Sequence, residues 1–435
     1  MRRINIGIMA APQVTFELAG GYMYNGSPIA DGEYTATVDG GLVLFAGKSL
    51  ERVVLAPAND ECRFTLHNVV IGINFHWERT QKQTFEGELH LFMEDGKVRA
   101  VNNLPVESYL ESVISSEMSP TASLEFLKAH TVISRSWLYA QLLRSQASTQ
   151  AVLGHSTSDE VIRWYAREDH TAFDLCADDH CQRYQGVPAA GNSRAKEAVK
   201  ATADIVLVSD GKVCDARFSK CCGGMTERFS ACWEDEDYPY LAAFRDNDGK
   251  QGLVDLTCEA AAREWIEGAP DAFCNTSDSV VLAQVLNGYD CETNDFYRWQ
   301  LRYTQQELSQ LVARRSGMDF GVIEELQPVE RAASGRLVRL RIVGSKRTVV
   351  VGKELEIRRW LSPSHLYSSA FVVDKLDDGN GSVDFVIKGA GWGHGVGLCQ
   401  IGAAMMGEKG FGYKQILQHY YPGAQLMTVD NIKDE

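Results

Sequence analysis

Three short stretches of this chain carry side chains that could do chemistry, and the first contributes a single carboxylate. Glu117 falls on the apolar stripe of a helix expected at residues 106–118, whereas Glu107 and Glu111 fall on the outer side, where a surface helix keeps its acids. The stripe follows the three-to-four spacing of a buried helix face and contains Val106, Tyr109, Leu110, Val113, Ile114 and Met118. A carboxyl group in apolar surroundings has a raised pKa, so Glu117 is a candidate general acid.

A second helix is expected to begin at about Ser123, and its stripe gives Glu117 a structural alternative. Arg135 falls on this stripe, whose other members are Leu124, Leu127, Thr131, Leu138 and Leu142. A buried ion pair between Glu117 and Arg135 would lower the pKa of the carboxyl group, and a carboxylate held charged in this way is not an acid catalyst. The sequence leaves both roles open.

The second stretch places four side chains of metal-ligand type within twelve positions: His170, Cys176, His180 and Cys181. Thiolates and imidazoles are the ligands that select zinc. The spacing differs from that of ordinary zinc fingers, and the alternative is a disulfide between Cys176 and Cys181. If all four side chains bind, the site is closed, and the zinc is structural rather than a generator of hydroxide.

The third stretch consists of two glycine-rich loops. Alternate glycines at residues 389–397 leave one side of the loop without side chains, so its backbone amides, with Trp392, His394 and Gln400, could face a bound substrate. His394 is equally consistent with a hydrogen-bonded structural histidine. A phosphate loop is not favoured, because the Gly-x-Gly-x-x-Gly pattern and a following Lys-Ser/Thr are missing. The earlier loop, at residues 223–226, also allows close backbone approach to a ligand.

The elements around these stretches indicate an α+β protein. With 435 residues the chain exceeds the size of one core, so two or three domains are expected. Residues 1–103 read as strands, including a hairpin that turns at Asp95 and Gly96, and a second hairpin turns at Asp210 and Gly211. Residues 304–307 form a capping box before a short helix. Residues 250–302 show no clear periodicity and are interpreted as an irregular insertion.

The composition and net charge of the chain argue against some classes of binding partner. A net charge of -15 argues against nucleic acid and acidic lipid surfaces, which both need clustered basic side chains, and no run approaches the roughly 20 apolar residues that span a bilayer. The short apolar run after Met1 is interpreted as a first strand, so we expect either a cytosolic chain or an export signal absent from the given sequence. The cysteines are too sparse for a disulfide scaffold, and adjacent Cys221 and Cys222 lack the spacing of a redox pair.

Taken in order, these motifs resemble the stage II sporulation protein D family of peptidoglycan lytic transglycosylases, over residues 97–425 without the insertion. The matching motifs lie at residues 106–118, 127–137, 176–186, 223–226 and 391–402. The resemblance implies that Glu117 is the catalytic glutamate and that the zinc ligands are His170, Cys176, His180 and Cys181. Cys221 and Cys222 depart from the family, which commonly has small hydroxyl residues there, and Cys399 stands where Met or Ser is more usual.

The resemblance also implies an architecture and a reaction. A β-rich region at residues 1–103 would precede a catalytic domain at residues 104–425, whose amphipathic helices surround a glycan-binding cleft. The chain would cleave the bond between MurNAc and GlcNAc and leave 1,6-anhydro ends, in the cell envelope and preferably on strands stripped of their peptides. The residues expected to contact the glycan are Arg135, Gly223, Gly224, Thr226, Trp392, His394 and Gln400.

Two functions of other classes stay open. The chain could be a non-catalytic peptidoglycan-binding protein that activates a separate cell-wall amidase, as some relatives are thought to be. It could also be a zinc hydrolase, which is disfavoured because a site with four protein ligands has no open position.

Overall fold

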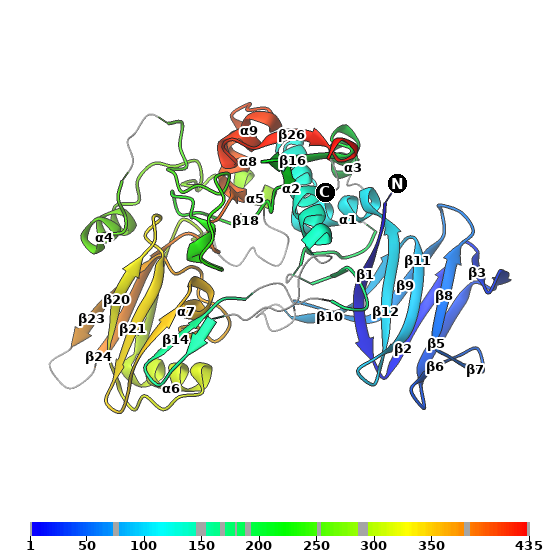
Figure 1. The fold of residues 1–435 in the computed structure, drawn as a ribbon, viewed down its shortest axis with the longest axis horizontal. Helices are drawn as coiled ribbons and strands as arrows, with labels where there is room; N and C mark the ends of the chain where they lie inside the picture. Colours follow the sequence, from blue (N-terminus) through cyan, green and yellow to red (C-terminus); the bar gives the residue numbers. More distant parts are fainter. Residues whose placement is uncertain are drawn as a thin grey trace. The chain divides into compact units, whose positions relative to one another are not determined.

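The computed structural model describes residues 2–72, 78–144, 154–165, 170–178, 181–187, 193–249, 254–285, 295–377 and 383–432. Helices and strands are mixed along the chain, which confirms the α+β class (Figure 1). The chain divides into two compact units: unit 1 comprises Met1–Pro120 and Arg167–Ala203, and unit 2 comprises Thr121–Ala166 and Asp204–Glu435. The expected domains at residues 1–103 and 104–425 stay a prediction.

Unit 1 is built on two sheets that pack face to face. In the described residues the larger sheet has the strand order β15 (Leu175–Cys176), β1 (Arg3–Ala11), β12 (Lys97–Pro105), β11 (Glu88–Glu94), β8 (Arg52–Pro57), β3 (Tyr22–Tyr24) and β4 (Ser27–Ile29). The other has the order β10 (Arg79–Phe85), β9 (Arg63–Ile71), β2 (Gln13–Ala19), β5 (Gly32–Asp39), β6 (Leu42–Phe45) and β7 (Lys48–Leu50).

The core between these sheets follows from alternation along the strands. In β2 every second side chain is buried, because successive residues of a strand point to opposite faces. Phe16 from this strand stacks on Phe45, and Phe64 stacks on Phe85, which fills the space between the sheets with aromatic rings. The predicted hairpin between β11 and β12 is confirmed, and its turn residues Asp95 and Gly96 both have positive φ.

In its described residues, unit 1 also contains two helices, and the first confirms the helix predicted at residues 106–118. Helix α1 (Val106–Glu117) buries the whole predicted stripe and ends before Ser119 and Pro120. Helix α3 (Ser193–Ala201) packs against it.

Unit 2 contains four sheets in its described residues. The five-stranded sheet has the order β13 (Gly154–Ser156), β14 (Glu160–Arg163), β22 (Thr348–Gly352), β21 (Leu337–Gly344) and β20 (Ile323–Arg331). Two three-stranded sheets have the orders β17 (Lys212–Val213), β16 (Ile205–Ser209), β26 (Gln425–Thr428) and β19 (Arg298–Thr304), β24 (Val383–Ala390), β23 (Phe371–Asp377). The fourth sheet pairs β18 (Phe218–Ser219) with β25 (Leu398–Cys399). Helices α6 (Gln305–Ser316) and α7 (Glu354–Trp360) pack against the β20–β22 strands, and α6 begins with the predicted capping box at Thr304.

Helix α2 (Leu124–Arg144) differs from the amphipathic helix that the sequence predicted. From Ala129 to Tyr139 every residue is buried, so the helix has no solvent face in this stretch. Three elements surround it in Figure 1: strand β16 and helices α8 (Gln400–Glu408) and α9 (Tyr413–Tyr420). Because the helix is enclosed in this way, the polar residues of the stretch are buried as well: His130, Thr131, Ser134, Arg135 and Ser136.

The expectation of an irregular insertion at residues 250–302 is wrong for much of its described part. Helix α4 (Glu259–Gly268) buries Ala262, Trp265 and Ile266, which follow a three-to-four spacing, and α5 (Ser279–Val285) and the start of β19 also lie in this segment. Helix α4 is short and rich in alanine, so its hydrophobic periodicity is weak in the sequence. None of the helices in the described part of the chain has both the length and the apolar character needed to cross a lipid bilayer.

Candidate functional site

Glu117 is the last residue of α1, and a loop of the same unit holds its carboxylate. The side chain is half-buried, and its Oε1 accepts a hydrogen bond of 3.1 Å from the main-chain N–H of Arg183. Two further hydrogen bonds join the loop to the helix: Gln185 N–H donates to Ser116 Oγ at 3.3 Å, and Ser112 Oγ donates to the carbonyl of Gly186 at 2.6 Å. The last turns of α1 therefore position the carboxylate and the loop together.

The loop fits this place because of two residues that match the family motif. Tyr184 is buried, stacks on Tyr109 of α1 at 5.3 Å, and donates its hydroxyl to Asn102 Oδ1 at 2.5 Å. Gly186 has a φ of +81°, and a Cβ atom there would lie 2.1 Å from the carbonyl oxygen of Thr84. Only glycine can take this backbone conformation and this approach without strain.

Three of the four predicted zinc ligands lie together in unit 1. The ligand atoms of His170, Cys176 and Cys181 are all within 4.8 Å of one another, and His170 Nε2 lies 3.7 Å from Cys181 Sγ. His180 lies outside the described residues. One imidazole and two thiols at this separation fit a zinc ion.

The same cluster is connected to Glu117 through the chain. Cys176 is fixed because β15 pairs in parallel with β1, opposite Gly7. Cys181 N–H donates to the carbonyl of Asp178, and Arg183, which donates to Glu117, follows two residues later. A metal bound at these ligands would therefore stiffen the segment that holds the carboxylate, while taking no direct part in the chemistry.

In unit 2 the two glycine-rich loops lie against each other. Cys221 and Trp392 exchange main-chain hydrogen bonds of 3.0 and 2.8 Å. Gly223 and Gly391 both have positive φ, and a Cβ atom on Gly223 would lie 2.9 Å from the nitrogen of Gly391. Gly224 is also closely packed, since its Cβ would meet Tyr297 and Trp265. Gly223 and Gly391 therefore allow the two loops to contact each other, and Gly224 allows the first loop to pack on Tyr297 and Trp265.

Arg336 was not among the candidate residues named from the sequence. The side chain is fully buried between the loops and donates to the carbonyl of Cys222 at 3.2 Å and to that of Gly393 at 3.2 Å. A Cβ atom on Gly395 would lie 2.5 Å from its guanidinium carbon. The alternating glycines of the second loop thus leave space for a buried guanidinium group. In the sequence, the only sign of this role is that an arginine directly precedes an apolar strand.

Glu227 completes the network around Arg336. Its buried carboxylate accepts from Ser334 Oγ at 2.5 Å, and the same hydroxyl accepts from Arg336 Nη1 at 2.9 Å. Burial raises the pKa of Glu227 above its usual range, against the opposing effect of these hydrogen bonds and of the Arg336 charge. Glu227 also lines a cavity of about 760 Å³, with Lys353 and Arg339, a volume typical of small-ligand sites.

Three residues expected to face the glycan instead have buried partners within unit 2. Arg135 is fully buried and its Nη1 donates to the carbonyl of Ile205 at 3.0 Å. Thr226 Oγ1 donates to the carbonyl of Ala242 at 2.9 Å. Gln400 Nε2 lies 3.2 Å from His130 Nε2, in the core beside α2. Arg135 and Glu117 belong to different units.

His394 and Trp392 lie closer to the surface. His394 is half-buried, its Nδ1 accepts from the N–H of Val396 at 3.0 Å, and its ring also bonds the main chain of Phe218. Burial and three nearby guanidinium groups lower the pKa of His394 well below its usual value, so it is neutral. These contacts favour the structural alternative for His394. Trp392 is half-buried and stacks on Tyr367 at 4.1 Å.

Two family models match separate parts of the chain. Residues 94–208 match the family described as Stage II sporulation protein, and this part contains α1, the described zinc ligands and α3. Residues 227–397 match a domain of unknown function, DUF8618. The second match begins after the first glycine-rich loop and contains Arg336 and the strands of the five-stranded sheet from β20 to β22.

Curated relatives match over most of the chain. An uncharacterized protein of Brachyspira hyodysenteriae is 24% identical over 351 residues, which cover 81% of this chain and 74% of that protein. The amidase enhancer of Bacillus subtilis is 27% identical, with 73% of this chain and 40% of that protein covered. Stage II sporulation protein D of Bacillus amyloliquefaciens is 22% identical, with 76% and 77% covered. The match at residues 94–208 and these relatives support the assignment of the chain to the stage II sporulation protein D family.

Proposed function

We propose that this protein acts on the bacterial cell wall as a lytic transglycosylase, with Glu117 as its catalytic residue. The observation that carries the proposal is the position of Glu117: a half-buried carboxylate at the end of α1, oriented by the N–H of Arg183 at 3.1 Å. It lies within the part of the chain that matches the sporulation protein family. A single oriented carboxyl group is what this reaction requires of the protein.

The reaction needs one group that acts first as an acid and then as a base. Glu117 donates its proton to the oxygen of the bond between MurNAc and GlcNAc while the bond from that oxygen to C1 of MurNAc breaks. The resulting carboxylate accepts the proton of the C6 hydroxyl of the same MurNAc, whose oxygen bonds to C1. The product carries a 1,6-anhydro end, and Glu117 is protonated again. Other glycosidases need a second carboxylate to activate water or to form a covalent intermediate.

Zinc is proposed as a structural cofactor of unit 1. His170, Cys176 and Cys181 would hold it, with His180 as the predicted fourth ligand. Zinc bound there would supply rigidity to the loop that contacts α1, and the acid and base steps belong to Glu117 alone.

Glycan binding in unit 2 is proposed to use Trp392, one of the side chains named from the sequence, together with a cavity that the sequence did not indicate. Arg135, Thr226 and Gln400 support the core, whereas Trp392 is half-buried and is proposed to stack on a sugar face. The cavity beside Glu227 offers polar and charged groups that suit sugar hydroxyls. A cell-wall substrate implies a location in the cell envelope.

The test is product analysis with a Glu117→Gln variant, which keeps the shape of the side chain and removes the acid. Purified peptidoglycan is incubated with the wild type, with Glu117→Gln and with Glu107→Gln, an acid on the outer side of the same helix. We expect anhydro-ended sugars from the wild type and the control, and a loss on the order of 10²-fold or more for Glu117→Gln. Full activity of a folded Glu117→Gln protein would overturn the proposal.

A second candidate function is activation of a cell-wall amidase without glycan cleavage. The similarity to the amidase enhancer of Bacillus subtilis favours it, although this chain covers 40% of that protein. The two functions give different products. An activator would release no anhydro sugars alone, but it would increase the release of stem peptides by an added amidase, equally in the wild type and in Glu117→Gln.

A further inference from the structure

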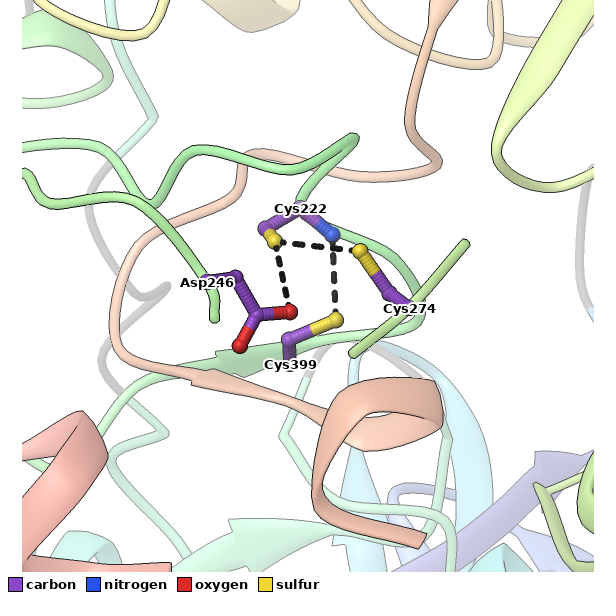
Figure 2. Close-up of side chains that lie close together, drawn as sticks. All are labelled: Cys222, Asp246, Cys274 and Cys399. Carbon is purple, nitrogen blue, oxygen red and sulfur yellow. Dashed lines mark hydrogen bonds between the residues drawn. The ribbon is translucent and has the colours of Figure 1, made fainter. Parts of the chain in front are cut away.

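A second cluster of metal-ligand type is buried in unit 2, far along the chain from the predicted zinc site. Figure 2 shows the side chains of Cys222, Asp246, Cys274 and Cys399 converging on one point. Their ligand atoms all lie within 4.8 Å of one another, and each residue is buried. Cys222 Sγ lies 3.5 Å from Cys274 Sγ and 3.3 Å from Asp246 Oδ2.

The spacing suits a shared cation better than a disulfide. In a tetrahedral site with zinc–sulfur bonds of about 2.3 Å, two sulfur ligands lie about 3.8 Å apart. The separation of Cys222 and Cys274 is close to this value, whereas a disulfide requires about 2.05 Å. A disulfide would also use only two of the three thiols and would leave the carboxylate of Asp246 beside a sulfur atom in the core.

The surroundings of the cluster resemble the outer contacts of a metal site. Asp246 Oδ1 accepts a hydrogen bond of 2.8 Å from the Tyr420 hydroxyl and lies 3.2 Å from His419 Nε2, which leaves Oδ2 toward Cys222. The N–H of Cys222 points at Cys399 Sγ at 3.2 Å. Donors of this kind orient ligating carboxylates and thiolates. Burying an anion is costly unless a cation is near, and a zinc ion would supply positive charge on the side of Asp246 that faces away from His419.

We propose that Cys222, Asp246, Cys274 and Cys399 bind one zinc ion in a closed structural site. Three thiolates and one carboxylate give zinc four ligands of types that it accepts, with no position left for water. Cys221 also contacts Cys274 and Cys399, and four thiols could instead hold an iron–sulfur cluster. The buried carboxylate favours zinc, since an oxygen ligand from Asp246 suits a zinc ion better than an all-thiolate cluster.

The proposed ion would connect parts of unit 2 that are distant in sequence. Cys222 precedes Gly223 in the first glycine-rich loop, and Cys399 ends β25, which follows the second loop and pairs in parallel with β18. Cys274 comes from the segment between α4 and α5. Gly402 packs closely against the carboxylate of this cluster, because a Cβ atom on Gly402 would lie 2.6 Å from Asp246 Oδ2. Zinc would therefore hold both loops and the α4–α5 segment in one arrangement.

The test counts zinc in the full-length chain, purified without chelators, for the wild type and for Cys274→Ser, Cys399→Ser, Asp246→Asn and Cys214→Ser. We expect both cysteine variants of the cluster to lose about one zinc per chain, and Asp246→Asn to bind that zinc more weakly against a competing chelator. The matched control Cys214→Ser replaces a buried cysteine elsewhere in unit 2 and keeps the full zinc content. Unchanged zinc in Cys274→Ser and Cys399→Ser would overturn the proposal, as would a disulfide between Cys222 and Cys274 in unreduced peptide maps.

A further variant separates this site from the zinc site of unit 1 and keeps the test valid if Cys274→Ser does not fold. Replacing both Cys176 and Cys181 by serine removes the thiolate ligands of unit 1 and leaves the unit 2 cluster intact. This protein, loaded with Co²⁺, should keep the thiolate-to-cobalt charge-transfer absorption. Loss of that absorption, or iron in place of zinc in the purified chain, would refute a zinc site at Cys222, Asp246, Cys274 and Cys399. Neither outcome depends on glycan cleavage.

Discussion

Replacing Arg336 by methionine is expected to loosen the contact between the two glycine-rich loops and to destabilise unit 2. The guanidinium group donates to the carbonyl of Cys222 and to Ser334 Oγ in buried hydrogen bonds, and to the carbonyl of Gly393 in a partly buried one. Each buried acceptor left without a partner costs about 1–3 kcal/mol. The Nε donor has no hydrogen-bond partner among the described residues, and methionine removes that unsatisfied group, which offsets part of the loss.

The net loss for Arg336→Met is therefore about 3–5 kcal/mol, the range found when one partner of a buried charged network is removed. For a unit of this size that corresponds to a decrease in melting temperature on the order of 10 °C. The assay is urea unfolding followed by tryptophan fluorescence. The matched control is Arg341→Met on β21, whose side chain is exposed and should change stability by less than about 0.5 kcal/mol.

A double-mutant cycle with Gly395→Ala makes this reasoning refutable. Alanine at position 395 adds a Cβ atom 2.5 Å from the guanidinium carbon of Arg336, at a φ of +77°. The steric part of the destabilisation by Gly395→Ala should disappear when Arg336 is already methionine. The decreases in unfolding free energy of the two single variants should therefore add up to more than the decrease in the double variant. Strict additivity, or equal effects of Arg336→Met and Arg341→Met, would show that Arg336 does not join the loops.

Three further outcomes are expected. The Cys181→Ser variant is expected to lose the zinc proposed for unit 1 and to cleave glycan more slowly, with little change in substrate affinity, because the segment that orients Glu117 is released. An unchanged cleavage rate in a zinc-free variant would contradict this. Burial lowers the pKa of His130 to about 3, so the unfolded chain binds a proton that the folded chain does not. As the pH falls from 6.5 toward 3, the wild type should therefore lose up to about 1.4 kcal/mol of stability per pH unit more than His130→Gln, measured by urea unfolding between pH 7 and pH 5. Amidase-treated sacculi should release more anhydro-ended sugars than intact sacculi, since the net charge of -15 repels acidic stem peptides; equal release would refute that preference.

The sequence predicted the elements whose signals are local. The stripe of α1 with Glu117 at its end, the turn at Asp95 and Gly96, and the capping box at Thr304 are all confirmed. Each signal arises within a few residues, from side chains on one helix face or from backbone conformations that few residue types tolerate. The cluster of His170, Cys176 and Cys181 was visible for the same reason, because His170 and Cys181 are only eleven residues apart.

The roles of the glycine-rich loops were not visible from the sequence. Alternate glycines allow close approach to a ligand, to another loop or to a buried side chain, and the pattern is the same in each case. The structure places Arg336 against Gly395 and pairs Gly223 with Gly391, so the glycines serve packing inside unit 2. Gln400 was likewise expected to face substrate, yet it contacts His130 in the core.

The buried cysteine cluster shows where the sequence reaches its limit. Cys222 and Cys399 are separated by 177 positions, and they meet because β18 pairs in parallel with β25 and Cys221 pairs with Trp392. The residue types determine which chemistry is available, because thiolates and carboxylates are ligands that zinc accepts. Which of them meet depends on the packing of segments that are distant in sequence, and that packing is set by the summed burial of many apolar side chains rather than by any short motif.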